Sequence, residues 1–205
     1  LTHQEEKGGL PLIHLFTHND LDGVGCGIVA KIAFKEKVKV HYNSVGSLNY
    51  QVAEFMEEAT PSHQIYITDL SVNDDNAKKL DCFVKQQEGF VQFIDHHKTA
   101  THLNEYSWAA VTVEYEDGRL TSATSLFYEY LLEKDLIDRS QPLDEVVELI
   151  RQYDTWEWDR NNNTKAKRLN DLLYMISIDD FEARMLQKLS STEKFDFDDF
   201  ETQII

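Results

Sequence analysis

The chain has 205 residues, of which 41% are hydrophobic, and its 20 basic and 37 acidic residues give a formal net charge of −17. This length fits one globular domain with an extension, and the distant Cys26 and Cys82 exclude CxxC-type zinc and redox motifs and predict no disulfide partner. No apolar run approaches the roughly 20 residues of a membrane span, and the polar residues 1–9 resemble no signal peptide, so we expect a cytoplasmic protein without a membrane partner.

The first half of the chain alternates between short apolar segments and segments with helical spacing. The strands expected from this pattern are residues 12–17, 38–43, 64–70, 90–94 and 110–115. The expected helices are residues 23–37, 48–59 and 73–87. The alternation predicts an α/β fold with a doubly wound, five-stranded, mainly parallel sheet flanked by helices.

The pattern changes near Ser122, after which only helical spacing is found. The helices expected there are residues 122–134, 143–153, 165–176 and 181–189. We therefore expect an α/β catalytic core at residues 1–120 and an all-helical part of the same domain at residues 121–192. Residues 193–205 contain the acidic stretch FDFDDF and are expected to begin a linker.

The first polar cluster, His18-Asn19-Asp20-Leu21-Asp22-Gly23, directly follows the first expected strand. In an extended loop, Asp20 and Asp22 point to the same side. Asp22 is also a candidate cap for the next helix, with Gly23 easing the turn. An ordinary strand–turn–helix junction uses the same residue types, but it has no need for His18.

Three further clusters are ambiguous when each is taken alone. Asp69 ends a strand and is typical of a turn, and the pair His96-His97 after Asp95 fits a solvated loop as well as a metal site. Asp154 ends a helix, where an acidic turn residue is ordinary. The neighbouring Trp156 and Trp158 are interpreted as core residues, because aromatic side chains mostly fill hydrophobic space.

Taken together, these clusters indicate one site. Three of the four lie at the carboxyl ends of expected strands, where ligands bind in parallel α/β sheets. Converging carboxylates repel each other unless cations are bound, and bound cations also attract phosphate to an acidic protein. Oxygen and imidazole ligands without thiolate suit Mn²⁺, Mg²⁺ or Co²⁺, and two-metal centres are typical of phosphoester hydrolysis.

The segments HNDLDG, TDL, DHH and YDTWEW resemble, in order, the four motifs of the DHH phosphoesterases, whose third motif is here Asp95-His96-His97. This family includes RecJ-type exonucleases, family II pyrophosphatases, cyclic-dinucleotide phosphodiesterases and nanoRNases. The HxDxD form of the first motif, with the segments THNDLDGVGCGIVAKIAF and LTSATSLFYEYLLE, is most similar to the nanoRNases of Gram-positive bacteria.

The resemblance implies two Mn²⁺ ions, with Mg²⁺ or Co²⁺ as substitutes. The implied ligands of one ion are His18, Asp20 and Asp69. Those of the other are Asp22, Asp69, His96 and Asp154, so that Asp69 is shared. By the same resemblance, Asp95 orients a histidine, His97 contacts the scissile phosphate, and a water shared by the two ions attacks phosphorus.

The implied activity is 3′–5′ hydrolysis of very short RNA, and also of 3′-phosphoadenosine 5′-phosphate. The chain departs from the family in lacking a glycine-rich GGGH-like motif, since its last glycine is Gly118. We therefore expect a C-terminal substrate-binding domain to be missing and oligonucleotides to be cleaved poorly. A cyclic-dinucleotide or pyrophosphate hydrolase, and a metal- and nucleotide-binding module without turnover, stay open as alternatives, as does a homodimer.

Overall fold

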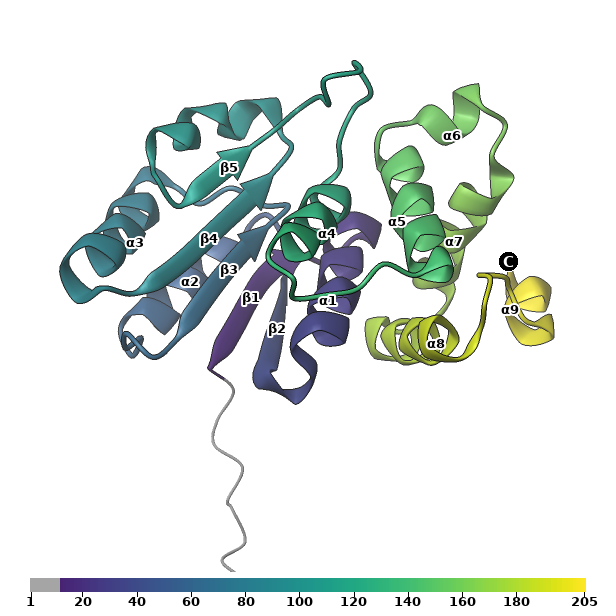
Figure 1. Cartoon of the computed structure of the whole chain (residues 1–205), viewed down its shortest axis with the longest axis horizontal. Coiled ribbons are helices and arrows are strands. Elements are labelled where there is room, and N and C mark those ends of the chain that lie inside the picture. Colours follow the sequence, from purple (N-terminus) through teal and green to yellow (C-terminus); the bar gives the residue numbers. More distant parts are fainter. Residues whose placement is uncertain (1–11) are drawn as a thin grey trace, which may run out of the picture.

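The computed structural model describes residues 12–205, so the polar start at residues 1–9 lies outside the described residues. A sheet of five strands in the order β2-β1-β3-β4-β5 forms the centre of the first half (Figure 1). All four neighbouring pairs are parallel. The strands are β1 (Ile13–His18), β2 (Val38–Asn43), β3 (Gln64–Thr68), β4 (Phe90–Asp95) and β5 (Ala109–Val111).

Helices cover both faces of the sheet, because successive side chains of a strand point to opposite faces. Leu15, Tyr66 and Ile94 pack against α1 (Leu21–Phe34) and α4 (Ala123–Glu133). Their neighbours in sequence share a second core with the helices of the other face, α2 (Leu48–Met56) and α3 (Asp74–Gln87). The doubly wound α/β prediction is thereby confirmed.

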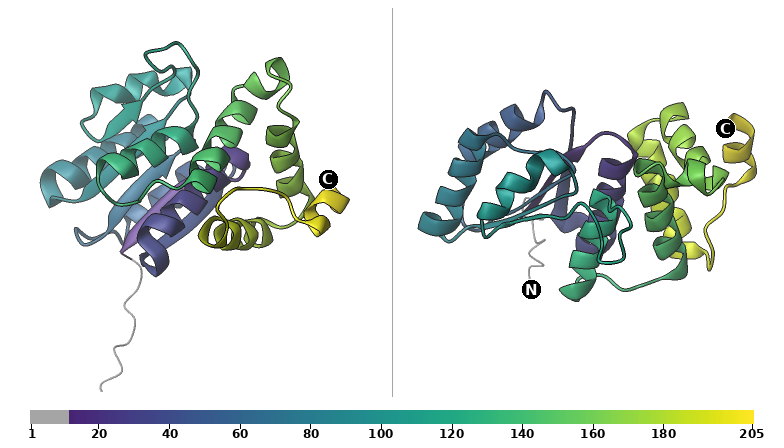
Figure 2. Two further views of the ribbon diagram at one scale, coloured as in Figure 1. Left: turned by 45° about the vertical axis from the view of Figure 1, so that its right-hand side comes forward. Right: turned by 90° about the horizontal axis from the view of Figure 1, so that it is seen from above.

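The remaining helices gather beside one end of the sheet, as both views in Figure 2 show. They are α5 (Gln141–Asp154), α6 (Glu157–Arg160), α7 (Thr164–Met175), α8 (Ile178–Ser191) and α9 (Asp199–Ile204). Leu21, Val24 and Ile28 of α1 are buried in the core of this group, while other residues of the same helix face the sheet. Helix α1 is therefore common to both halves and fixes one against the other.

Several boundaries differ from the sequence-based expectation. The fifth strand ends at Val111, because the chain then turns back on itself and pairs Glu114 with Leu120 in an antiparallel bridge. Residues 35–37 form the 3-10 helix η1 (Lys35–Lys37), and a second one, η2 (Lys98–Glu105), follows β4. Within residues 193–205, where we expect a linker to begin, Phe195 is fully buried in the helical core.

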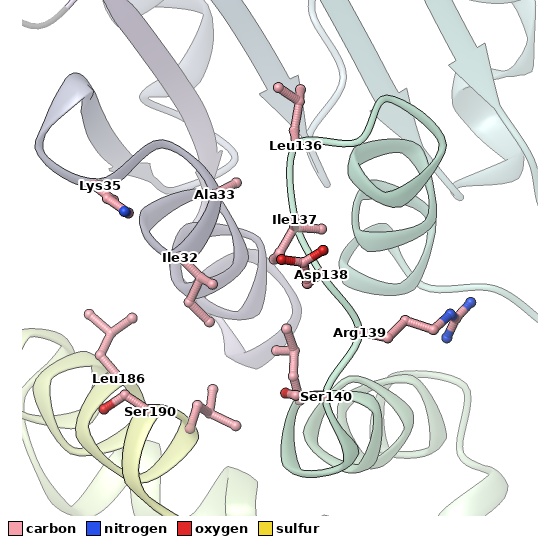
Figure 3. A pocket seen from close by; sticks show the side chains of 12 residues that line it. Ile32, Ala33, Lys35, Leu136, Ile137, Asp138, Arg139, Ser140, Leu186 and Ser190 are labelled. Atoms are coloured by element: carbon pink, nitrogen blue, oxygen red, sulfur yellow. The ribbon is translucent and has the colours of Figure 1, made fainter.

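A groove of about 440 Å³ separates α1 from α8 and from the segment that leads into α5 (Figure 3). Its walls are largely aliphatic, with Ile32 facing Leu186, and Leu189 also lines it. None of the residues predicted for the site lines this groove. Within residues 12–205, no helix combines the length and the apolar character that crossing a membrane requires.

The C-terminal segment offers a test of the helical packing. We expect Phe195→Ala to lower the free energy of unfolding by about 3 kcal/mol, because it empties a fully buried aromatic site. Phe200→Ala is the matched control, since this side chain is 47% exposed, and it should change stability by less than about 1 kcal/mol. Urea denaturation measures both variants, and equal stabilities would contradict the packing of this segment.

Candidate metal centre

The polar clusters of the sequence meet at the carboxyl edge of the sheet. His18 ends β1, Asp69 directly follows β3 and Asp95 ends β4, while Asp154 reaches the same place as the last residue of α5. This edge lies at the topological switch point, because β2 is on one side of β1 and β3 is on the other. Open α/β sheets bind their ligands at such a point.

Two groups of potential ligand atoms are found there, and Asp69 faces both. In the first group, His18 Nδ1 lies 2.7 Å from Asp20 Oδ2 and 3.8 Å from Asp69 Oδ2. In the second, His96 Nε2 lies 3.4 Å from Asp69 Oδ1, 3.5 Å from Asp22 Oδ2 and 3.6 Å from Asp154 Oδ2. The structure thus brings together all six residues that the sequence predicts as ligands.

The chemistry of these atoms fits divalent cations. Asp69 Oδ2 and His96 Nε2 are both buried without a hydrogen-bond partner, which is costly unless another group satisfies them. In the part of the chain that the structure describes, the ion pairs of the clustered carboxylates involve histidines and neither lysine nor arginine. A cation between these atoms would satisfy them and balance the carboxylates.

The crowding of carboxylates also shifts their proton affinities. Burial, together with the charges of Asp22 and Asp20, raises the pKa of Asp69 well above its usual range. Burial and the same two charges raise the pKa of Asp154 to about 8. Ionised carboxylates at these positions therefore destabilise the protein without a cation.

Asp20 and Asp22 are held by different helices, which corrects one sequence-based expectation. Asp20, and not Asp22, caps α1, because its side chain accepts a hydrogen bond from the Gly23 N–H at 3.1 Å. The Asp22 carboxylate instead accepts hydrogen bonds from the backbone N–H groups of Ala123 and Thr124, at 2.7 and 2.8 Å. Asp22 thus sits at the start of α4, where the helix dipole stabilises a negative charge.

Two backbone features place the ligands close together. A Cβ atom on Gly23 would lie 2.2 Å from the carbonyl oxygen of His18, so only glycine lets the first turn of α1 approach the end of β1. Asp69 has a left-handed backbone with φ of 63°, a conformation that costs energy for a residue with a side chain. Both features bend the chain where β1 and β3 end.

Asp95 orients His97. The carboxylate is fully buried and accepts hydrogen bonds from Ser71 Oγ at 3.1 Å and from the His96 backbone N–H at 2.8 Å. Its Oδ1 atom also lies 2.7 Å from His97 Nδ1. The hydrogen bond with Asp95 raises the pKa of His97, whose side chain is 48% exposed. This pair places a hydrogen-bonding imidazole beside the ligand atoms.

Arg151 is a supporting residue that the sequence analysis missed. Its buried guanidinium donates to both Glu148 and Glu157 and to the carbonyl oxygen of Leu120, with distances between 2.7 and 3.0 Å. These bonds tie the end of α5, and so Asp154, to α6 and to the loop before α4. Its only sequence signal was one basic residue three positions before Asp154, which is ordinary in a helix.

The expectation that both tryptophans belong to the core is wrong for Trp156. Its side chain is 69% exposed, and its backbone is left-handed with φ of 61°. Trp158 does pack against the helical core. The difference arises because the chain turns sharply after α5, which directs two aromatic residues that are two positions apart to different environments.

The repulsion among the carboxylates can be measured in the metal-free protein. Asp69 ionises less readily in the fold than in the unfolded chain, so its charge costs stability above the unfolded pKa. Asp69→Asn should raise the thermal midpoint at pH 8 by about 3 °C, since ~1 kcal/mol corresponds to roughly 2–4 °C in a protein of this size. The exposed Asp75→Asn is the control, and a lower midpoint for Asp69→Asn alone would contradict the repulsion.

Comparisons with known proteins find relatives that align along most of the chain. No family model matches the chain. Over 197 residues it is 55% identical to oligoribonuclease NrnB of Bacillus subtilis, an alignment that covers 95% of the chain and 49% of that protein. It is 22% identical over 200 residues to a 3′,5′-cyclic-nucleotide phosphodiesterase of Helicobacter pylori, covering 91% of the chain and 52% of the relative.

The chain therefore spans about half the length of the curated relatives that it matches. A crystal structure of an uncharacterised protein from Helicobacter pylori G27 shares the fold, with a TM-score of 0.59 and 16% identity over 94% of this chain and 68% of that one. The four motifs and the long alignment with oligoribonuclease NrnB agree with each other, and the resemblance of this chain to the nanoRNases of the DHH phosphoesterases is confirmed.

Proposed function

We propose that the protein is a two-metal phosphodiesterase that degrades very short RNA from the 3′ end. The observation that carries this proposal is the sharing of Asp69 between two groups of ligand atoms, 3.8 Å from His18 and 3.4 Å from His96, beside the Asp95–His97 pair. Two cations that share a carboxylate form the usual centre for phosphoester hydrolysis. Degradation of short RNA would place the protein in the cytoplasm.

Six residues would hold two Mn²⁺ ions. His18, Asp20 and Asp69 lie within ligating range of one position, and Asp22, His96 and Asp154 lie within range of the other. Asp69 would contribute to both through its two oxygens. Bound divalent cations would neutralise charge on the phosphate and lower the pKa of the attacking water.

His97 would bind the scissile phosphate directly. Asp95 engages its Nδ1 atom at 2.7 Å, which fixes the ring and leaves Nε2 for a ligand. A hydrogen bond from Nε2 to a phosphate oxygen, or to the departing oxygen, would stabilise the charge that develops during cleavage. Asp95 would act through His97, as carboxylates next to metal sites commonly do.

The substrate is proposed from the relatives. Oligoribonuclease NrnB is named for short RNA, and this supports short RNA as a ligand of this chain. Small phosphorylated nucleotides, including 3′-phosphoadenosine 5′-phosphate, are proposed beside it from the motif resemblance. The second candidate is hydrolysis of a cyclic nucleotide, because the more distant relative is a 3′,5′-cyclic-nucleotide phosphodiesterase. Both reactions cleave a phosphodiester and use the same centre.

Metal binding can be tested without turnover. Adding Mn²⁺ at about 100 times its Kd should raise the thermal midpoint by about 5–10 °C, because ligand binding at that excess contributes ~2.7 kcal/mol. EDTA should reverse the rise, and Asp69→Asn should abolish it, because both ligand groups lose a charged oxygen. An equal Mn²⁺-induced rise in Asp69→Asn would contradict the shared ligand.

Catalysis is tested with RNA of two to five nucleotides and Mn²⁺, with oligoribonuclease NrnB assayed in parallel. We expect mononucleotides to be released, and His97→Ala to reduce kcat by about 10²–10⁴-fold. Asp95→Asn should reduce kcat by about 10–100-fold, since it acts by positioning His97.

The matched control for the activity assay is His102→Ala, an exposed histidine of η2, which should retain full activity. Cleavage of 3′,5′-cyclic AMP but not of RNA would favour the second candidate. Mn²⁺ binding with no turnover of any of these substrates, while oligoribonuclease NrnB remains active, would support a binding module instead.

A further inference from the structure

Trp156 lies at the rim of a cavity that contains part of the metal centre. The cavity has a volume of about 280 Å³, which is near the lower end of the usual range for small-molecule pockets. His96, His97 and Asp154 line one part of it. The other lining residues, from η2, the loop before α4 and the turn after α5, are Lys98, Val113, Leu120, Thr121, Thr155 and Trp156.

This cavity therefore joins two kinds of surface. One part carries the groups proposed to hold the phosphate, and the other offers Val113, Leu120 and the indole of Trp156. Lys98 adds a positive charge to the lining of a strongly acidic protein. A nucleotide has the same division, because its phosphate is charged and its base presents two flat apolar faces.

Protein packing does not account for a tryptophan at this position. The side chain is 69% exposed, whereas large aromatic residues are usually well buried. Its left-handed backbone, with φ of 61° and ψ of 12°, is one that glycine or asparagine adopts at lower cost. An exposed aromatic residue in a strained conformation beside a binding cavity is a candidate for direct ligand contact.

Trp156 is the outermost of three neighbouring aromatic rings. Tyr153 stacks on Trp158 with their centroids 6.0 Å apart and their planes 17° apart. Trp158 in turn contacts Trp156 at 6.4 Å with an angle of 33°. Because most of the Trp156 surface is still exposed, this support restricts the indole without covering it.

From this geometry we infer that Trp156 is a stacking platform for the nucleobase of the nucleotide whose phosphate occupies the metal centre. The inference rests on the proposed function, because it takes the phosphate position from it. Stacking on an aromatic ring tolerates every base, so this contact recognises a nucleotide without selecting its sequence. It accounts for the apolar wall and for the exposed, strained tryptophan together.

The test compares the binding of adenosine 5′-monophosphate with that of ribose 5-phosphate in the presence of Mn²⁺, by titration calorimetry on the full chain. Base stacking contributes about 1–3 kcal/mol, so the nucleotide should bind about 5–150-fold more tightly than the sugar phosphate. Trp156→Ala should reduce this ratio to about one without changing the affinity for ribose 5-phosphate. Trp156→Phe should keep most of the ratio.

Two controls separate stacking from a structural effect. Tyr50→Ala removes another exposed aromatic residue, located on α2 outside the lining of this cavity, and should leave both affinities unchanged. Trp156→Gly should leave the thermal midpoint unchanged or raise it, because glycine accepts the left-handed backbone. A fall of several degrees would mean that Trp156 is needed for packing and would overturn the inference.

The outcomes also distinguish this inference from the proposed function. If Trp156→Ala keeps the preference for adenosine 5′-monophosphate, stacking on Trp156 is wrong while the metal-dependent phosphate site stands. If Trp156→Ala weakens both ligands equally, the tryptophan supports the phosphate site and does not bind the base. If neither ligand binds to the unaltered protein with Mn²⁺, the proposed function fails, and the inference fails with it.

Discussion

The mutual repulsion of buried carboxylates is the interaction on which the rest of this structure depends. Asp22 and Asp69 are both about 2% exposed, and His96 Nε2 lies within 3.5 Å of an oxygen of each. The protein offsets only part of the negative charge of these carboxylates. The first N–H groups of α4 donate to Asp22, and the imidazole of His96 lies beside both carboxylates. Divalent cations bound between these atoms would balance the remainder.

Holding these carboxylates in place requires both halves of the domain. Three strand ends contribute candidate ligands from the sheet, whereas Asp154 comes from the end of α5. Helix α1 is buried in the cores of both halves, and Arg151 ties the end of α5 to α6 and to the Leu120 loop. The bonds of the buried Arg151 guanidinium fix the position of the end of α5 more than they stabilise the fold. The free-energy cost of removing the guanidinium from water offsets much of its attraction to the two glutamates.

The surroundings of the centre are better placed than the centre itself to select a substrate. The two curated relatives are named for short RNA and for a cyclic nucleotide, and both reactions cleave a phosphodiester. In the proposed function, the candidate ligands and the Asp95–His97 pair would act on the phosphate that all such substrates share. Trp156 and the apolar wall next to it lie outside this set and face the cavity, so residues of this kind would distinguish a nucleotide from a simple phosphate ester.

Most helices and strands could be predicted from the sequence, because the residue patterns that specify them lie within each segment. The second strand was predicted at residues 38–43, as observed, and the helix expected at residues 73–87 is α3 (Asp74–Gln87). The six candidate ligands were also proposed from sequence, because polar clusters at the carboxyl ends of parallel strands meet at one edge and because the four motifs resemble those of the DHH phosphoesterases. Their identification depended on the joint pattern, since each cluster alone resembles an ordinary turn.

Features that depend on distant partners were decided only by the tertiary structure. The carboxylate of Asp22 binds N–H groups about 100 residues further along the chain, so sequence spacing suggested the wrong helix for it. The same limitation applies to Arg151, whose partners include the carbonyl of Leu120, and to Trp156, whose exposure depends on a turn between two helices. By itself, the sequence determined which residue types are available and which elements carry them. Packing decided which of their atoms meet, because that depends on contacts between residues far apart in the chain.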